Sequence, residues 1–304
     1  MRNYAVNGTL LLMQVPAQFQ YEKATSVEHA LGLLGKYGPE SRVVAGGHSL
    51  IPMMKLRLAQ PQALIDINEV EELTRISVEE HMLRIGAMVR HAELLSSAVA
   101  GEHFPIFHDA EKLIADPVVR NRGTIGGSLC QADPSEDLSA VFAAIRGEAV
   151  IQGGEGQRVV PIREFFTGPY ETVVADGELL VAVRVPIRSS ASAYQKVERR
   201  AGDWAVAAAG AELRLDGDTV AEAGIGLTAV GAANFHVPEA EEFLVGGPAT
   251  AERFARAGEI AAEHCQPVAD QRGPVDYKRH LAATLTARAL GAALARWHGR
   301  HQEA

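Results

Sequence analysis

Two short segments, each built around a pair of adjacent glycines, constrain this chain more than any other feature of its sequence. The first runs through Ala45, Gly46, Gly47, His48, Ser49 and Leu50, and the second through Thr124, Ile125, Gly126, Gly127 and Ser128. Both have an apolar approach, the two glycines, and then small or polar side chains. Glycine accepts positive φ and lets a ligand come close to the backbone. Successive amide N–H groups in such a turn form an anion-binding concavity.

A single pair of glycines usually marks a plain turn. Two segments of matching pattern favour a diphosphate site instead, and the hydroxyls of Ser49, Thr124 and Ser128 could add donors to it. Neither segment has the spacing GxGxxG or GxxxxGKS/T, so the dinucleotide-binding βαβ fingerprint and the P-loop are both excluded. The role of His48 stays open, because no Ser-His-Asp arrangement and no second metal ligand lies near it in the sequence.

Composition narrows the class of protein. The 304 residues include 38 acidic and 29 basic side chains, for a net charge of -9, which argues against a nucleic-acid binder. The two cysteines, Cys130 and Cys265, are too few for an iron–sulfur cluster and favour a reduced, cytoplasmic protein over a disulfide-bonded one. An apolar run at residues 8–13 is too short to span a membrane and lacks signal-peptide flanks. We expect residues 1–12 to be a loosely held leader.

Residue patterns predict an α+β fold, because strands and helices do not alternate regularly in the first half. Helices are expected at 25–38, 90–99, 106–116 and 136–145, and a long glycine-bearing loop at 121–137. Strands are expected at 42–47, 62–67, 73–89 (two strands) and 177–186, with hairpins at 148–162 and around Asp216-Gly217. Two helices end the chain, at 249–264 and 274–298. A linker-like stretch places a domain boundary near residue 190.

Two further residues have competing interpretations. Asp137 begins a predicted helix, so its carboxylate could cap that helix or accept hydrogen bonds from a ribose. Lys196 lies close to Arg199 and Arg200, and such a cluster usually forms a solvated face. A fixed cation could instead stabilise the negative charge that a flavin ring gains on reduction.

At these residues the sequence resembles a known family. The stretches AGGHSLIPMMKLRL and ADPVVRNRGTIGGSLCQADPSEDL resemble the FAD-binding medium subunit of the molybdenum hydroxylases, the xanthine dehydrogenase family. The stretches KVERRAGDWAVAAAG and ADQRGPVDYKRHL look most like the medium subunits of aerobic molybdenum–copper carbon monoxide dehydrogenases. The likeness runs from about residue 14 to residue 297. The glycine segments are specific for the family, whereas the likeness to the carbon monoxide enzymes is much less specific.

The resemblance implies a fold and a set of cofactor contacts. It implies a vanillyl-alcohol-oxidase-type FAD-binding domain of two α+β parts at 13–190, and a smaller domain of antiparallel sheet plus helical bundle at 191–304. Residues 45–50 would wrap the FAD diphosphate from one side, and residues 124–128 would meet the FAD from the other. The other implied contacts are Asp137 at the adenosine end, apolar Ile114 and Leu180, Lys196 near the flavin, and Tyr194 stacking nearby. Val89 and Arg90 stand where relatives often have two threonines, so no hydroxyl contact is implied there.

The resemblance also implies electron transfer through FAD. A large partner subunit would hold the molybdenum cofactor with copper, and a small partner would hold two [2Fe–2S] clusters, in a dimer of heterotrimers. Electrons would pass to a quinone, and the complex would work in the cytoplasm or at the inner face of the plasma membrane. No catalytic or metal-binding residue is expected in this chain. An alternative is another molybdenum hydroxylase, with a heterocycle or an aldehyde as substrate.

Two other functions are compatible with the glycine segments: a self-contained FAD oxidase and a non-enzymatic scaffold protein. In a self-contained FAD oxidase, His48 would be bonded covalently to the flavin, but about 110 residues after position 190 leave little room for the large substrate domain that such enzymes carry. In a non-enzymatic scaffold protein, the two glycine segments would have lost the ability to bind a flavin cofactor. The intact glycines in both segments argue against that reading.

Overall fold

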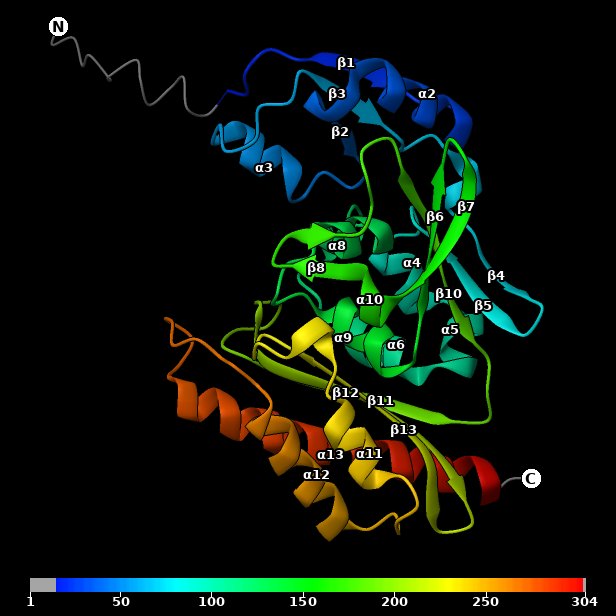
Figure 1. The fold of residues 1–304 in the computed structure, drawn as a ribbon, viewed down its shortest axis with the longest axis vertical. Helices are drawn as coiled ribbons and strands as arrows, with labels where there is room; N and C mark the ends of the chain where they lie inside the picture. The colour runs from blue at the N-terminus through cyan, green and yellow to red at the C-terminus, as the bar shows by residue number, and fades with distance from the viewer. Residues whose placement is uncertain (1–14, 303–304) are drawn as a thin grey trace, which may run out of the picture.

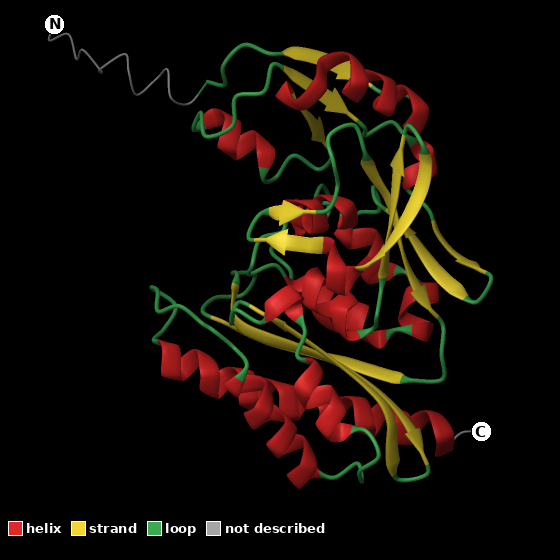
Figure 2. Cartoon of the chain, in the orientation of Figure 1, coloured by secondary structure: helices red, strands yellow, loops and turns green. Residues whose placement is uncertain are grey.

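The computed structural model describes residues 15–302 and arranges them in three successive units (Figure 1). Helices and strands are mixed in each unit, which confirms the predicted α+β class (Figure 2). The predicted leader at residues 1–12 lies outside the described residues. Within those residues, no helix combines the length and the apolar character that crossing a membrane requires.

The first unit is a small parallel sheet with the strand order β1-β3-β2. Its helix α2 lies within the range 25–38 expected from the sequence: the Ser26 side chain accepts a hydrogen bond from the amide of His29, and Gly38 ends the helix at φ +62°. The elements of this unit are β1 (Gln20–Lys23), α2 (Val27–Tyr37), η1 (Gly38–Glu40), β2 (Ser41–Val44), α3 (Leu50–Lys55) and β3 (Ala63–Asp66). The first glycine segment therefore connects β2 to α3.

The second unit is a five-stranded antiparallel sheet with the order β4-β5-β10-β6-β7, packed against short helices. The hairpin predicted at 148–162 is present, but its turn lies one residue later than Gly153-Gly154: Gly153 pairs with Gly156, and Gly154 and Glu155 form the turn. The strands are β4 (Ile76–Glu79), β5 (Met82–Gly86), β6 (Glu148–Gly153), β7 (Gly156–Pro161), β8 (Phe166–Gly168), β9 (Glu171–Thr172) and β10 (Leu179–Pro186). The helices are η2 (Glu71–Leu73), α4 (His91–Ser96), α5 (Ala98–His103), α6 (Pro105–Glu111), α7 (Pro117–Arg120), α8 (Ile125–Gln131), α9 (Asp137–Ala144) and α10 (Ile162–Phe165).

One expectation in this unit is wrong. The stretch 121–137 is not a continuous loop, because it contains the helices α8 and the start of α9. A glycine inside a helix makes helix formation less favourable by about 1 kcal/mol than an alanine at the same position. Here the Thr124 hydroxyl caps α8 by accepting from the amide of Gly127 at 3.1 Å, and packing against β5 and β10 supplies the rest. Tertiary contacts therefore override the local propensity.

The third unit is the antiparallel sheet β11-β12-β13 covered by helices on both faces. Helices α12 and α13 lie on one side, and α6 and α9 of the second unit approach from the other (Figure 1). The approach of α9 is close: a Cβ on Gly226 would lie 1.8 Å from the carbonyl oxygen of Ala140. The elements are β11 (Ala191–Glu198), β12 (Ala205–Asp216), β13 (Thr219–Thr228), η3 (Ala233–Phe235), α11 (Pro238–Leu244), α12 (Ala251–Glu263) and α13 (Val275–Gln302).

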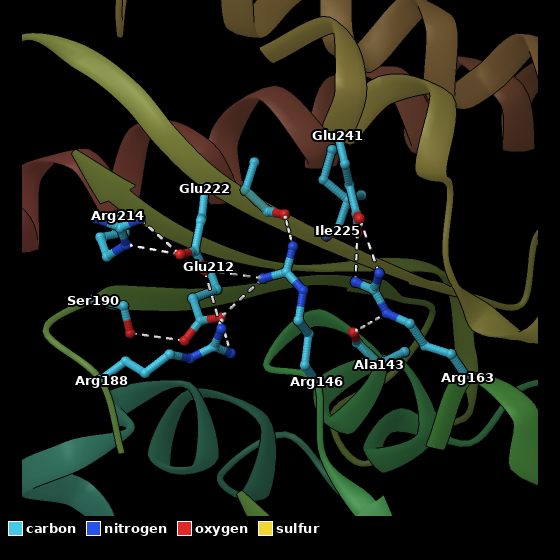
Figure 3. A network of polar contacts seen from close by, with 11 residues as sticks. Ala143, Arg146, Arg163, Arg188, Ser190, Glu212, Arg214, Glu222, Ile225 and Glu241 are labelled. Atoms are coloured by element: carbon cyan, nitrogen blue, oxygen red, sulfur yellow. Dashed lines mark hydrogen bonds and ion pairs between the residues drawn. The ribbon is translucent and has the colours of Figure 1, made fainter. Parts of the chain in front are cut away.

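Charged side chains join the second unit to the third (Figure 3). Arg163 of α10 forms a two-bond pair with Glu241 of α11, at 2.6 and 2.9 Å, and Glu241 also accepts from the amide of Ile225 at 2.7 Å. Arg188, between β10 and β11, donates to Glu212 and Glu222 on the third sheet. These contacts help hold the third sheet against α6, which packs on β11, and against α9, which packs on β12 and β13.

Candidate functional site

The two glycine segments meet in space. A Cβ on Gly46 would lie 2.3 Å from the carbonyl oxygen of Arg122 and 2.9 Å from the Cα of Gly123, and one on Gly127 would lie 3.9 Å from the Cβ of Ala45. The absence of a side chain at Gly46 is therefore what lets the two backbones touch. Segments nearly eighty positions apart in the sequence form one site, between α3 and α8 (Figure 1).

The first segment offers free backbone donors. Gly47 is in the left-handed region at φ +83°. Among residues 15–302, no acceptor pairs with the amides of Gly46, Gly47, His48 or Ser49, while Ala45 is held through its carbonyl oxygen. The side chains of His48 and Ser49 are exposed. Four consecutive unpaired amides around a glycine with positive φ are the arrangement that binds an anion.

The second segment is different, and the expectation of a second set of free amides is wrong. The amides of Ile125 and Gly126 donate to the carbonyl oxygens of Val89 and Ala87, at 3.0 and 2.8 Å. The amide of Gly127 is used by the Thr124 hydroxyl, and that of Ser128 by the Thr124 carbonyl at 3.0 Å. The glycines serve packing here: a Cβ on Gly126 would lie 2.6 Å from that of Ala87.

Two residues that the sequence reasoning did not assign link the segments. The guanidinium of Arg90 donates to the carbonyl oxygen of Arg122, beside the second segment, and to Oδ1 of Asn68 at 2.7 Å. The amide nitrogen of Asn68 then donates to the carbonyl oxygen of Ala45 at 2.8 Å. Arg90, at a position where relatives often have threonine, was the feature of the sequence that could have indicated this link. Its role depends on Asn68, which follows β3 and cannot be recognised from the sequence pattern.

Asp137, Tyr194 and Lys196 form one buried cluster. Nζ of Lys196 donates to Oδ2 of Asp137 at 2.9 Å and to the carbonyl oxygen of Leu113 at 3.2 Å, and the Tyr194 hydroxyl donates to Oδ1 of Asp137 at 2.6 Å. The Lys196 side chain is only 1% exposed, so its solvated-face interpretation is wrong. The capping interpretation of Asp137 is also wrong, because Glu136 caps α9.

This cluster limits the implied roles. An extended dinucleotide keeps its adenosine and its flavin far apart, on either side of the diphosphate. Asp137 and Lys196 touch each other, so they cannot serve opposite ends of one cofactor. Burial raises the pKa of Asp137, and the neighbouring Lys196 ammonium and Tyr194 hydroxyl oppose that rise. The ring of Tyr194 is 2% exposed, which leaves no open face for the implied stacking contact.

The two implied apolar contacts differ in exposure. Leu180 lies on β10 inside the core of the second unit and is 3% exposed. Ile114 is half-buried, and its carbonyl oxygen accepts from Arg120 at 2.8 Å. Ile114 follows Leu113, whose carbonyl oxygen binds Lys196, so it lies next to the buried cluster in the chain.

The site has the donor set that FAD requires and lacks that of a metal site. Unpaired amides in the first segment and the hydroxyl of Ser128 suit a diphosphate, because both groups donate hydrogen bonds. Because Gly46 has no side chain, the two segments can lie in contact with each other. Among residues 15–302, no three histidine, cysteine or acidic side chains gather as metal ligands would.

Comparisons with known proteins agree with this geometry. Residues 17–188 match the model of the FAD binding domain in molybdopterin dehydrogenase, and residues 192–293 match the CO dehydrogenase flavoprotein C-terminal domain. The carbon monoxide dehydrogenase medium chain of Hydrogenophaga pseudoflava is 41% identical over 93% of this chain and 99% of its own length. The 6-hydroxypseudooxynicotine dehydrogenase complex subunit alpha of Paenarthrobacter nicotinovorans is 35% identical over 92% of this chain and 96% of its own length.

A solved structure extends the likeness to three dimensions. The carbon monoxide dehydrogenase from Hydrogenophaga pseudoflava that lacks the Mo-pyranopterin moiety of the molybdenum cofactor contains a chain that superimposes with a TM-score of 0.90. The Hydrogenophaga chain is 42% identical in sequence, and the match covers 93% of the present chain and 99% of the Hydrogenophaga chain. The predicted fold, an FAD-binding domain followed by an antiparallel sheet with helices, is thereby confirmed. The chain belongs to the family of FAD-binding medium subunits of the molybdenum hydroxylases, and it is an oxidoreductase subunit.

Proposed function

We propose that this chain binds FAD across the two glycine segments and transfers electrons from the [2Fe–2S] clusters of a partner subunit to a respiratory acceptor, a quinone. The complex would oxidise carbon monoxide to carbon dioxide. The observation that carries the proposal is the meeting of Gly46 with Arg122 and Gly123, which brings the four unpaired amides of the first segment against the second segment, where Ser128 is half-buried. Sequence identity to the medium chain of a carbon monoxide dehydrogenase supports the substrate.

FAD, when bound, supplies a group that takes single electrons and releases them singly or in pairs. The residues of this chain would bind and orient it. The amides of residues 46–49 would hold the diphosphate, and Ser128 would add a hydroxyl donor from the other side. Lys196, which is buried and paired with Asp137, would act on the flavin as a fixed cation near the ring rather than through an open contact, and Tyr194 would hold Asp137 in place.

The proposal assigns the metals to other chains. A large subunit would carry the molybdenum cofactor with copper, and a small subunit would carry the clusters. Two such heterotrimers would associate in the cytoplasm or at the inner face of the plasma membrane. Two similar structures support this assignment in part, because one is a Cu,Mo-CO dehydrogenase and the other is a carbon monoxide dehydrogenase that lacks the Mo-pyranopterin moiety of its molybdenum cofactor. The residues described here hold no metal-ligand cluster of their own.

The relative from Paenarthrobacter nicotinovorans favours a second candidate, a medium subunit whose partner oxidises a heterocycle or an aldehyde. Metal analysis of the complex purified from its host through this chain separates the two. Molybdenum, iron and near-equimolar copper would support carbon monoxide oxidation. Molybdenum and iron without copper would favour the second candidate. FAD with no metal at all would contradict both and leave a stand-alone flavoprotein.

A further inference from the structure

A buried histidine lies directly behind the second glycine segment. His91 begins α4 and is 3% exposed, and its Nδ1 lies 3.0 and 3.1 Å from the two carboxylate oxygens of Glu111, which is fully buried on α6. Its Nε2 lies 3.0 Å from Oγ of Ser128 on α8. The ring packs closely, because a Cβ on Gly123 would lie 2.9 Å from its Cδ2. Three elements thus align a carboxylate, an imidazole and a hydroxyl.

The surroundings of His91 are acidic. Besides Glu111, the charges of Glu136, which caps α9, and of Asp137 at the start of α9 raise the pKa of His91, and the charge of Arg120 on α7 lowers that of Glu111. Burial alone would lower the pKa of His91, but the charge and the hydrogen bond of Glu111 reverse this and leave the pKa above its usual value. Glu111 therefore favours the imidazolium form of His91, while burial also raises the pKa of Glu111 itself.

The protonation state of His91 decides the direction of the Ser128 hydrogen bond. An imidazolium donates from both nitrogens, so Nε2–H donates to Oγ of Ser128 and the hydroxyl hydrogen stays free to donate elsewhere. A neutral ring that keeps its hydrogen on Nδ1, toward Glu111, has an acceptor at Nε2. The Ser128 hydroxyl then donates inward to His91 and is lost to any ligand.

The same three residue types form a hydrolase triad, and the structure argues against that use. A triad needs amide donors placed for an oxyanion beside the nucleophile. The amides of residues 125–128 are all paired within the protein. The hydroxyl of Ser128 is thus equipped to donate a hydrogen bond to an anion rather than to attack a carbonyl.

We propose that His91, clamped by Glu111, is a positioning residue that turns the Ser128 hydroxyl outward as a donor to an anionic oxygen of the FAD diphosphate. The inference rests on the proposed FAD site. This role of His91 predicts that the affinity for FAD decreases as the pH rises. Binding is tight while His91 carries its proton and weakens as the pH rises through the pKa of His91, because the outward donor of Ser128 is then lost.

The test is the dissociation constant of FAD for the full-length protein freed of FAD, measured by flavin fluorescence from about pH 6 to about pH 9. A hydrogen bond to a charged group is strong enough for a change of roughly tenfold or more across this range. Ser128→Ala should bind FAD at every pH as weakly as the unaltered protein does at high pH. Glu111→Gln should keep the tight limit at low pH and move the midpoint of the transition to lower pH.

A second histidine provides the matched control. His48 lies in the first segment, and His48→Gln should leave the midpoint where it was, whatever it does to the affinity itself. A pH transition that persists in Ser128→Ala, or a midpoint that Glu111→Gln does not move, would overturn the role of His91. Unaltered protein that binds no FAD at any pH would instead contradict the proposed function.

Discussion

The two glycine segments share one sequence pattern but do different work in the folded chain. The first leaves the amides of Gly46, Gly47, His48 and Ser49 unpaired, whereas the second uses every amide from Ile125 to Ser128 internally. In the first segment glycine provides a left-handed turn at Gly47 and a backbone contact at Gly46. In the second, Gly126 only makes room for Ala87. The same glycine pattern therefore marks a turn with free amides in one place and a tightly packed helix start in the other.

Gly47→Val tests the first half of this comparison and should have the largest effect. A β-branched side chain resists the φ of +83°, and its Cβ would lie 3.1 Å from Ile51. We expect FAD content per purified chain, read from the flavin absorbance, to fall to near zero. Gly154→Val is the control, because Gly154 has no neighbour within 4 Å and no positive φ. Full FAD content in Gly47→Val would mean that the first segment does not bind the diphosphate.

Gly126→Val tests the second half. Overpacking against Ala87 should destabilise the protein by about 1–3 kcal/mol, measured as a lower midpoint of chemical unfolding. The protein that remains folded should still bind FAD, since no free amide is lost. Unchanged stability combined with lost FAD affinity would reverse the comparison and make the second segment the principal binding turn.

Arg90→Ala asks whether the two segments depend on each other. The change removes the link from Arg122 through Asn68 to Ala45, so FAD affinity should fall about tenfold, which is about 1.4 kcal/mol. Asn68→Ala should have a similar effect, and the double variant should be no weaker than either single one. Additive losses in the FAD titration would show that Arg90 and Asn68 act separately.

Thr124→Ala should have the smallest effect. It removes the hydroxyl that caps α8, which costs about 1 kcal/mol of unfolding free energy. Thr124→Ser keeps that oxygen and should restore most of the loss in the same unfolding measurement. A large decrease in FAD affinity at unchanged stability would instead show that Thr124 contacts the cofactor directly.

Local signals explain what could be predicted. The helix at 25–38 and the two hairpins, at 148–162 and around Asp216-Gly217, could be predicted because capping residues and turns depend on neighbours a few positions away. The α8 helix was missed because its own residues, Gly126 and Gly127, disfavour a helix. Its stability comes from strands and turns that precede and follow it at long range.

The sequence by itself determined where the backbone can turn and where it can approach another chain segment, because glycines, caps and apolar spacing act locally. Only the tertiary structure decided which amides stay free, since their partners are carbonyl groups far along the chain, such as those of Ala87 and Val89. It also decided that Lys196 pairs with Asp137 and that His91 lies behind Ser128. Hydrogen-bond partners and burial belong to the packed structure, and no pattern of neighbouring residues contains them.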